Sequence, residues 1–390
     1  MSSRRLRVAG AASIVALVTS LFFGASAGPV AGAADPADQA VADAAAAWIA
    51  LQQEADGGFE LADFPGFETP DAVLAIASAA QTGSTWSTAE ALAAIEALEF
   101  GGSGGPTPID ALDDWYFPTR SGTGGINAGE AAKLVLLVIA PLGLDTEAFG
   151  PSATDIAALV YPMGCDEAPD TAGVFFLETV YVALAGGLLC GAPDATLIQS
   201  IRDAQRDDGG WNYNGSTAPA NPNDPFDPNL PSVDATALAM QALVAGGAPW
   251  NDPAILGGLA YLADTQSASG AFPAYGSDDP NATAVAMLAI AAAGFDPNAA
   301  CWRDTAVPAG AGTPYGGPSA WIRSQQEPDG RIRGPNDGFG VNTFATSQPV
   351  EGLLRNWLPY DRATGAPTCL VGSPDDTAPD PVALVPRFTG

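Results

Sequence analysis

Two kinds of helical segment alternate along the chain. Segments of the first kind are apolar almost all round, and they span 70–80, 128–139, 172–185, 233–245, 281–293 and 344–357. Segments of the second kind have one apolar face, and they span 36–53, 88–98, 152–160, 194–205, 252–265 and 318–326. A helix that is apolar on every side must be buried on every side. The pattern therefore predicts an all-α fold, an α6/α6 toroid with six apolar helices inside six amphipathic ones.

One sequence unit recurs within this pattern. Segments 47–59 and 320–332 both begin Ala-Trp-Ile and continue into Gln-Gln-Glu-x-Asp-Gly, and segments 201–211 and 261–272 are more divergent copies. The matched glutamines, Gln53, Gln205, Gln266 and Gln326, are 152, 61 and 60 residues apart, so the first interval has room for degenerate copies. Repeated units stack on their neighbours around one shared core. We therefore expect one toroid domain over 34–358, followed by a Pro- and Asp-rich tail over 359–390.

The helix, the Gln-x-x-Asp-Gly-Gly turn, the following aromatic residue and the second helix together resemble the repeat of the prenyltransferase and squalene-cyclase superfamily. The resemblance covers about residues 36–357 and implies the terpenoid cyclase type of α/α toroid. In cysteine use, repeat count and the string Gly-Gly-Ile-Asn-Ala-Gly at 124–129, the chain is similar to secreted bacterial transcobalamin-like proteins. That similarity implies a corrinoid, cobalamin, at the barrel mouth. The β domain that closes such carriers has no counterpart in the 33 residues after Trp357.

Charge and the N-terminal segment indicate the compartment. The 390 residues include 14 Lys and Arg, 44 Asp and Glu and no His, for a net charge of −30. Arg4, Arg5 and Arg7 precede an apolar run over 8–23 and small-residue cleavage sites, which predicts a secretory signal peptide over 1–33. So acidic a surface repels nucleic acid. No later apolar stretch is long enough for a membrane span, and we expect a secreted monomer that binds a small molecule.

The cysteines fit an exported protein. Cys165, Cys190, Cys301 and Cys369 form no Cys-x-x-Cys pair. An even number of cysteines in an exported chain predicts two disulfides. Three connectivities are open, and sequence-local pairing (Cys165 with Cys190, Cys301 with Cys369) is preferred.

Several catalytic signatures lack an essential residue. The absence of His excludes Ser-His-Asp and Cys-His nucleophile systems, as well as the zinc site of protein prenyltransferases, which is built from Asp, Cys and His. The Asp-x-Asp-Asp motif of the cyclases is absent, since its nearest relatives at 110–114 and 277–280 differ in spacing. The thioester motif Gly-Cys-Gly-Glu-Gln is absent too, since Ala168 stands where the Gln is required. The sequence therefore favours non-catalytic binding of a corrinoid or an extended apolar ligand, and no metal is expected.

Candidate ligand-binding residues lie near the repeated turns and on the inner helices. Trp211, Tyr213, Phe272 and Tyr275 could form an aromatic rim. The alternative for Phe59, Trp211 and Phe272 is structural, filling gaps between the two rings. Lys133, the only lysine, could hold an anion inside the barrel or pair with Glu130 one turn away.

The alternative function is a carboxylate-dependent enzyme, either terpene cyclase-like or a glycan-active lyase or hydrolase, because two carboxyls can do such chemistry without His. Glu178, amid apolar residues over 175–181, is the catalytic candidate, since burial would raise its pKa. The other acids weighed are Asp71, Asp113, Asp114, Asp234, Asp278 and Asp279. Asp71 and Asp234 are expected to cap inner helices. The oxygen-rich loop 221–229 could bind calcium, but it lacks the EF-hand pattern.

Overall fold

The computed structural model describes residues 35–59, 68–83, 85–116, 126–221, 223–224, 227–306, 315–334, 343–359 and 362–363. These residues are mostly helical, as predicted for an all-α fold, and they include one small antiparallel hairpin, β1 (Phe272–Ala274) with β2 (Ser277–Asp279). Residues 1–33, where the signal peptide is predicted, lie outside the described residues, as does most of the 359–390 tail.

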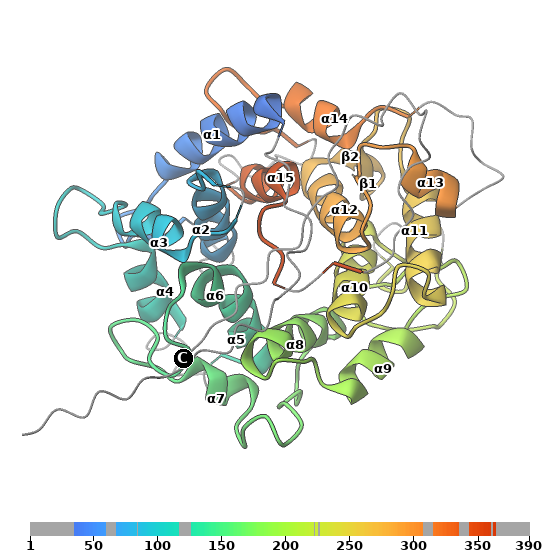
Figure 1. The fold of residues 1–390 in the computed structure, drawn as a ribbon, viewed down its shortest axis with the longest axis horizontal. Helices are drawn as coiled ribbons and strands as arrows, with labels where there is room; N and C mark the ends of the chain where they lie inside the picture. Colours follow the sequence, from blue (N-terminus) through green and yellow to red (C-terminus); the bar gives the residue numbers. More distant parts are fainter. Residues whose placement is uncertain are drawn as a thin grey trace, which may run out of the picture.

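The apolar segments form an inner group of helices (Figure 1). They are α2 (Thr69–Ala79), α5 (Ala128–Leu134) with its continuations η1 (Val135–Ile139) and α6 (Ala140–Leu142), α8 (Phe176–Leu189), α10 (Val233–Ala245), α12 (Pro280–Ala292) and α15 (Phe344–Leu354). Neighbours in this order contact one another, and α15 returns to contact α2. The inner helices therefore enclose a common axis, and the residues that face it come from segments far apart in sequence.

The amphipathic segments lie outside this group (Figure 1). They are α1 (Pro36–Ala50), α3 (Thr88–Glu96), α7 (Ile156–Val160), α9 (Ala195–Asp203), α11 (Pro253–Thr265) and α14 (Pro318–Ser324). Two further outer helices, α4 (Pro108–Tyr116) and α13 (Cys301–Ala306), were not expected from the pattern. Helix α8 begins four residues later than expected, because the Phe175 amide donates to Oε2 of Glu178 at 2.9 Å and starts the helix there.

The repeated glutamines join neighbouring outer segments. The side-chain amide of each donates to the carbonyl four residues later, within its own turn. In three copies the same amide also donates to a carbonyl of the next outer segment, at Leu98, Ala254 or Val41. The bond from Gln326 to Val41, at 2.9 Å, joins the last repeat to α1. The repeat therefore supplies its own connector, and its last copy closes the ring.

A glycine allows this close approach. Gly330 has φ of +100°, and a Cβ placed on it would lie 2.3 Å from the carbonyl oxygen of Ala44 in α1. Gly209 is similar, since its φ is +86° and a Cβ placed on it would lie 2.3 Å from the carbonyl oxygen of Gly257 in α11. A side chain at either position would meet both backbone strain and a clash. The glycines of the motif therefore fix the spacing between successive outer segments.

Residues after α15 cover the C-terminal ends of the inner helices. Trp357 donates from its indole to the carbonyl of Leu136 at 3.1 Å, and its ring lies 4.9 Å from that of Trp86. The side chain of Asn356 donates to the carbonyl of Ser78 at the end of α2. Apolar packing and satisfied backbone groups therefore occupy this end.

One predicted disulfide is confirmed and the other falls partly outside the described chain. Cys165 and Cys190 are bonded and close a loop between α7 and the end of α8. Cys301 is disulfide-bonded, whereas Cys369 lies outside the described residues. Among the helices that the structure describes, none combines the length and apolar character needed to cross a membrane.

Candidate functional site

Asp234 in α10 is held by a tyrosine instead of capping its helix. The cap is Ser232, whose hydroxyl accepts from the Ala235 amide at 3.1 Å. The Asp234 carboxyl accepts a hydrogen bond of 2.8 Å from the Tyr213 hydroxyl. Burial raises the pKa of Asp234 to about 6, the Tyr213 bond opposes this rise, and the charge of Asp279 adds to it. The expected capping role is therefore wrong for Asp234, which is a carboxyl with an unusual proton affinity.

Asp71 also has a partner outside its own helix. Its Oδ2 lies 2.8 Å from Nζ of Lys133, and both side chains are largely buried. Its Oδ1 accepts from the Gln348 amide in α15 at 3.2 Å. Helix α2 has no side-chain cap bond at its start. Asp71 is thus a buried ion-pair partner and not the predicted cap, and Lys133 pairs across helices, inside the inner group.

Two further buried carboxyls lie near this ion pair. Glu68 accepts a hydrogen bond from the Thr343 hydroxyl, and burial raises its pKa to about 7. Glu351 in α15 has its pKa raised by burial and by the charge of Asp71, while Lys133 lowers it. Neither residue was predicted from the sequence. Glu351 could have been found by the reasoning applied to Glu178, since it too interrupts an apolar inner segment.

Glu178 lies at the start of α8 in a fixed position. Its carboxyl accepts from the Phe175 amide at 2.9 Å and from the Asn127 side-chain amide at 3.2 and 3.3 Å. Helix α5 packs closely beside it, because a Cβ on Gly129 would lie 2.3 Å from the Glu178 Cβ. Glu178 is partly exposed. The residue therefore combines two orienting donors with solvent access.

Tyr181 on α8 is affected by the charges of four of these acids. Burial, and then the negative charges of Asp71, Asp234, Glu351 and Glu178, raise the pKa of its phenol. We name these four acids, with Lys133 and Tyr181, the inner carboxyl cluster. Its members come from α2, α5, α8, α10 and α15, so the closed order of the inner helices brings them together.

The structure separates the four predicted aromatic residues into two kinds. Trp211 and Phe272 have no exposed surface. Their amides donate to the inner-helix hydroxyls of Thr236 and Thr283, so both residues pack between the two layers as the structural alternative expects. Tyr213 is 36% exposed and Tyr275, in the turn of the hairpin, is 62% exposed. Only the two tyrosines therefore offer surface to a ligand.

The remaining acids weighed from the sequence have local partners or face solvent. Asp113 accepts from the amide and hydroxyl of Ser152, and Asp279 caps α12. Asp278 accepts from two serine hydroxyls, and Asp114 is exposed. In the 221–229 loop, Asp227 accepts backbone amides across its own turn. Local contacts therefore account for the positions of four acids outside the cluster, Asp113, Asp227, Asp278 and Asp279.

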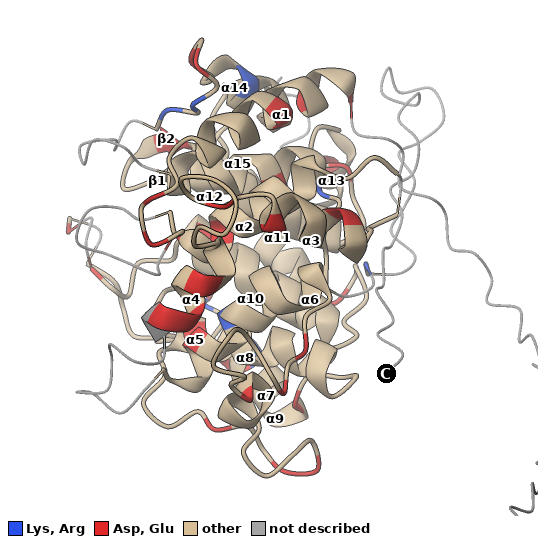
Figure 2. Cartoon of the chain, turned by 90° about the vertical axis from the view of Figure 1, so that its left-hand side faces the viewer, with Lys and Arg blue, Asp and Glu red and all other residues tan. Residues whose placement is uncertain are grey.

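Acidic residues dominate the electrostatics around the cluster. Figure 2 shows Asp and Glu positions on many elements, α4 among them, and Lys and Arg on few. Within the cluster the four carboxyls outnumber the single lysine, which pairs with Asp71. A field of this sign opposes the approach of phosphate or diphosphate groups.

Comparison with known proteins gives only distant structural likeness. No protein-family model matches the chain, and no curated protein matches it. A variant of the type II terpene cyclase MstE from Scytonema, in complex with geranylgeranyl dihydroxybenzoate, is 16% identical, covers 82% of this chain and 97% of its own, and gives a TM-score of 0.49. A protein from Actinoplanes is 17% identical, covers 82% of this chain and 99% of its own, and gives a TM-score of 0.45. A glycosidase variant in complex with glucose is 14% identical, covers 82% of this chain and 96% of its own, and also gives a TM-score of 0.45. At these values the chemistry must be argued from this chain's own residues.

Proposed function

We propose that the chain is an exported α6/α6 toroid of the terpenoid cyclase type whose inner carboxyl cluster performs acid–base chemistry on a neutral glycan. The closed contact order of the inner helices supports the toroid. The Cys165–Cys190 disulfide supports an oxidising compartment, in agreement with the signal peptide predicted over 1–33.

The observation that carries the proposal is the environment of Asp234. A carboxyl with a pKa of about 6 keeps a proton available in mildly acidic solution and can transfer it in a reaction. Its bond to Tyr213 fixes the orientation of one carboxyl oxygen, and Asp234 takes no part in capping α10. A purely structural acid at a helix start would be expected to bond the backbone instead.

Glu178 is the complementary base. Its two donors, Asn127 and the Phe175 amide, orient the carboxylate without neutralising it. In the proposed hydrolysis, Asp234 protonates the glycosidic oxygen, and the bond from that oxygen to the anomeric carbon breaks. Water adds to the anomeric carbon, and its proton passes to Glu178. Lys133 and Asp71 form an ion pair within the same cluster.

The charges and polarity of the cluster favour a glycan among the ligands considered. Hydroxyl groups can donate to carboxylates and need no countercharge. The excess of negative charge disfavours a diphosphate. The full burial of Trp211 and Phe272 removes half of the aromatic rim on which binding of a corrinoid or an extended apolar ligand was expected to rest.

Non-catalytic binding at the same end of the barrel is the second candidate. The observation in its favour is that Asp71, Glu178 and Asp234 each already have a partner inside the protein. Such a site would hold a ligand through the exposed surface of Tyr213 and Tyr275.

Incubation of the purified mature protein with a panel of neutral polysaccharides separates the two candidates. Release of new reducing ends that is lost in Asp234→Asn supports the enzyme. Binding without release that is weakened by Tyr275→Ala supports the second candidate. A protein that neither binds nor cleaves any polysaccharide in the panel overturns both.

A further inference from the structure

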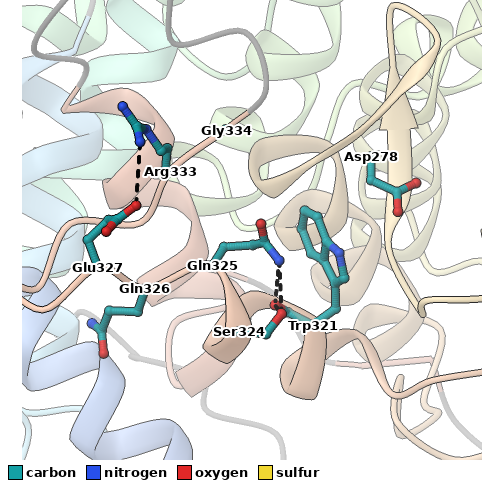
Figure 3. A pocket seen from close by; sticks show the side chains of 8 residues that line it. All are labelled: Asp278, Trp321, Ser324, Gln325, Gln326, Glu327, Arg333 and Gly334. Atoms are coloured by element: carbon teal, nitrogen blue, oxygen red, sulfur yellow. Dashed lines mark hydrogen bonds and ion pairs between the residues drawn. The ribbon is translucent and has the colours of Figure 1, made fainter.

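A surface pocket of about 530 Å³ lies beside α14 and the β1–β2 hairpin (Figure 3), and no residue of the inner carboxyl cluster is among the residues that line it. Trp321, Ser324 and Gln325 line it from the end of α14 and the residue after it, and Asp278 lines it from β2. Its size falls in the range of roughly 300 to 1,000 Å³ typical of small-ligand sites.

Two neighbouring residues of β2, Asp278 and Asp279, have different surroundings. Successive side chains of a strand point to opposite faces. Asp279 turns inward and caps α12 through the Asn281 and Ala282 amides. Its neighbour Asp278 lines the pocket, where the hydroxyls of Ser267 and Ser269 donate to its Oδ2 at 3.1 and 2.7 Å. The serines, and not members of the inner carboxyl cluster, therefore orient the Asp278 carboxyl.

An indole forms the apolar part of the pocket. Trp321 is partly exposed, whereas Trp48, at the same position of the first repeat, is only 6% exposed. In Figure 3 the Trp321 ring lies between the Gln325 side chain and Asp278. The same repeat position therefore serves the core in one copy and offers an aromatic surface in another.

Planar polar groups line the same pocket as this indole. Gln325 donates to the Ser324 hydroxyl at 2.8 Å, which orients its amide. Arg333 pairs with Glu327 at 3.6 Å, so the guanidinium charge is balanced within the pocket wall. With Asp278 the described lining has a small excess of negative charge. The pocket therefore combines one aromatic face with hydrogen-bonding groups and gives an anion no advantage.

We propose that this pocket binds one or two sugar units of a neutral glycan, at a site separate from the inner carboxyl cluster. The C–H face of a pyranose is apolar and packs on the Trp321 indole, while neighbouring hydroxyls bond the amide of Gln325 and the carboxylate of Asp278. The proposal concerns binding alone and does not depend on turnover at the cluster.

Isothermal titration of the mature protein with trisaccharides of glucose, N-acetylglucosamine, mannose and galactose tests it. We expect at least one trisaccharide to bind, and Trp321→Ala to weaken its binding by about tenfold, which corresponds to about 1.4 kcal/mol, because the stacked indole face is lost. Gln325→Ala should weaken it about three- to tenfold. Gln52→Ala is the matched control, because Gln52 occupies the same repeat position in a copy outside the pocket.

Each outcome bears on the proposal. Binding lost in Trp321→Ala but kept in Asp234→Asn supports the pocket, even if no glycan is ever cleaved. Binding that survives Trp321→Ala, or no binding of any of the four trisaccharides by the folded wild-type protein, overturns it. Circular dichroism melting curves show whether each variant is folded, and Trp321→Phe, which keeps an aromatic face, should retain most of the affinity.

Discussion

Tyr213 donates a hydrogen bond of 2.8 Å to Oδ2 of Asp234, although 21 residues separate the two along the chain. The tyrosine follows the buried Trp211 in the loop after α9, and the aspartate is the second residue of α10. The repeat motif thus positions Trp211 in the core and, two residues later, places a phenol on an inner-helix carboxyl.

Removal of the Tyr213 hydroxyl should raise the pKa of Asp234 further. The bond stabilises the charged carboxylate and so lowers the pKa against the effect of burial. We expect Tyr213→Phe to raise the pKa above 6 by about one unit, the equivalent of one hydrogen bond to a charged group. Carbon-13 NMR titration with labelled aspartate, assigned with Asp234→Asn, measures this. An unchanged or lower pKa would contradict the proposed role of the tyrosine.

The stability of the fold should increase as the solution becomes mildly acidic. The pKa values of Glu68 and Asp234 are raised on folding, so between their unfolded and folded values the native state binds more protons than the unfolded state. This contribution is present in full below about pH 4 and is lost as the pH rises through about 6 to 7. Thermal melts at pH 5 and pH 8 should therefore show a higher Tm at pH 5, and a lower Tm at pH 5 than at pH 8 would contradict this expectation.

Glu68→Gln isolates that effect at one residue. Glutamine keeps an oxygen that can accept from Thr343 but carries no charge. We expect the substitution to stabilise the protein at pH 8 by on the order of 2 kcal/mol and to change little at pH 5. Urea unfolding at the two pH values provides the comparison. Equal effects at both would mean that the Glu68 carboxyl does not carry the raised pKa.

Loss of the Lys133 charge should be costly and should depend on Asp71. Lys133→Met leaves buried carboxyls without their positive neighbour, and we expect a loss of about 3 kcal/mol in unfolding free energy near pH 7.5. The double variant Lys133→Met, Asp71→Asn should recover a large part of it. A double variant no more stable than Lys133→Met alone would show that Asp71 is not the partner through which Lys133 stabilises the protein.

The connection between the last repeat and α1 can be tested with adjacent glutamines. Gln326→Ala removes donors to Val41 and Gly330, and we expect it to lower the unfolding free energy by about 1 to 3 kcal/mol. Gln325→Ala removes only contacts within its own segment and should change stability by less than about 0.5 kcal/mol. Similar losses in both would argue against Gln326 as the residue that closes the ring.

Much of the helical fold could be predicted because burial leaves a direct signature in the sequence. The segment over 233–245 is apolar on every side, and the structure places a helix there with the same bounds. The short α4 and α13 were missed, and α8 began late because Glu178 bonds the Phe175 amide. The repeated Gln and Gly positions could be recognised, whereas their partners in the next segment required the three-dimensional arrangement.

The site was harder to predict because its members meet only when the inner helices surround a common axis. Glu178 and Lys133 were identified from local context, and both belong to the cluster. Position in the helix suggested that Asp71 and Asp234 are caps, but partners from other segments, Lys133 and Tyr213, determine their roles. Glu351 could not be linked to Asp71 in sequence, since 280 residues separate them.

The most direct test of the central claim is the pH dependence of reducing-end release from neutral polysaccharides, measured for the wild-type protein and Asp234→Asn. A general acid with a pKa of about 6 predicts that the rate falls as the pH rises through that value. Asp234→Asn should then lose about 10²- to 10⁴-fold in rate while remaining folded. A rate that is independent of pH between 5 and 8, or that is unchanged in Asp234→Asn, would contradict the assignment of Asp234 as the proton donor.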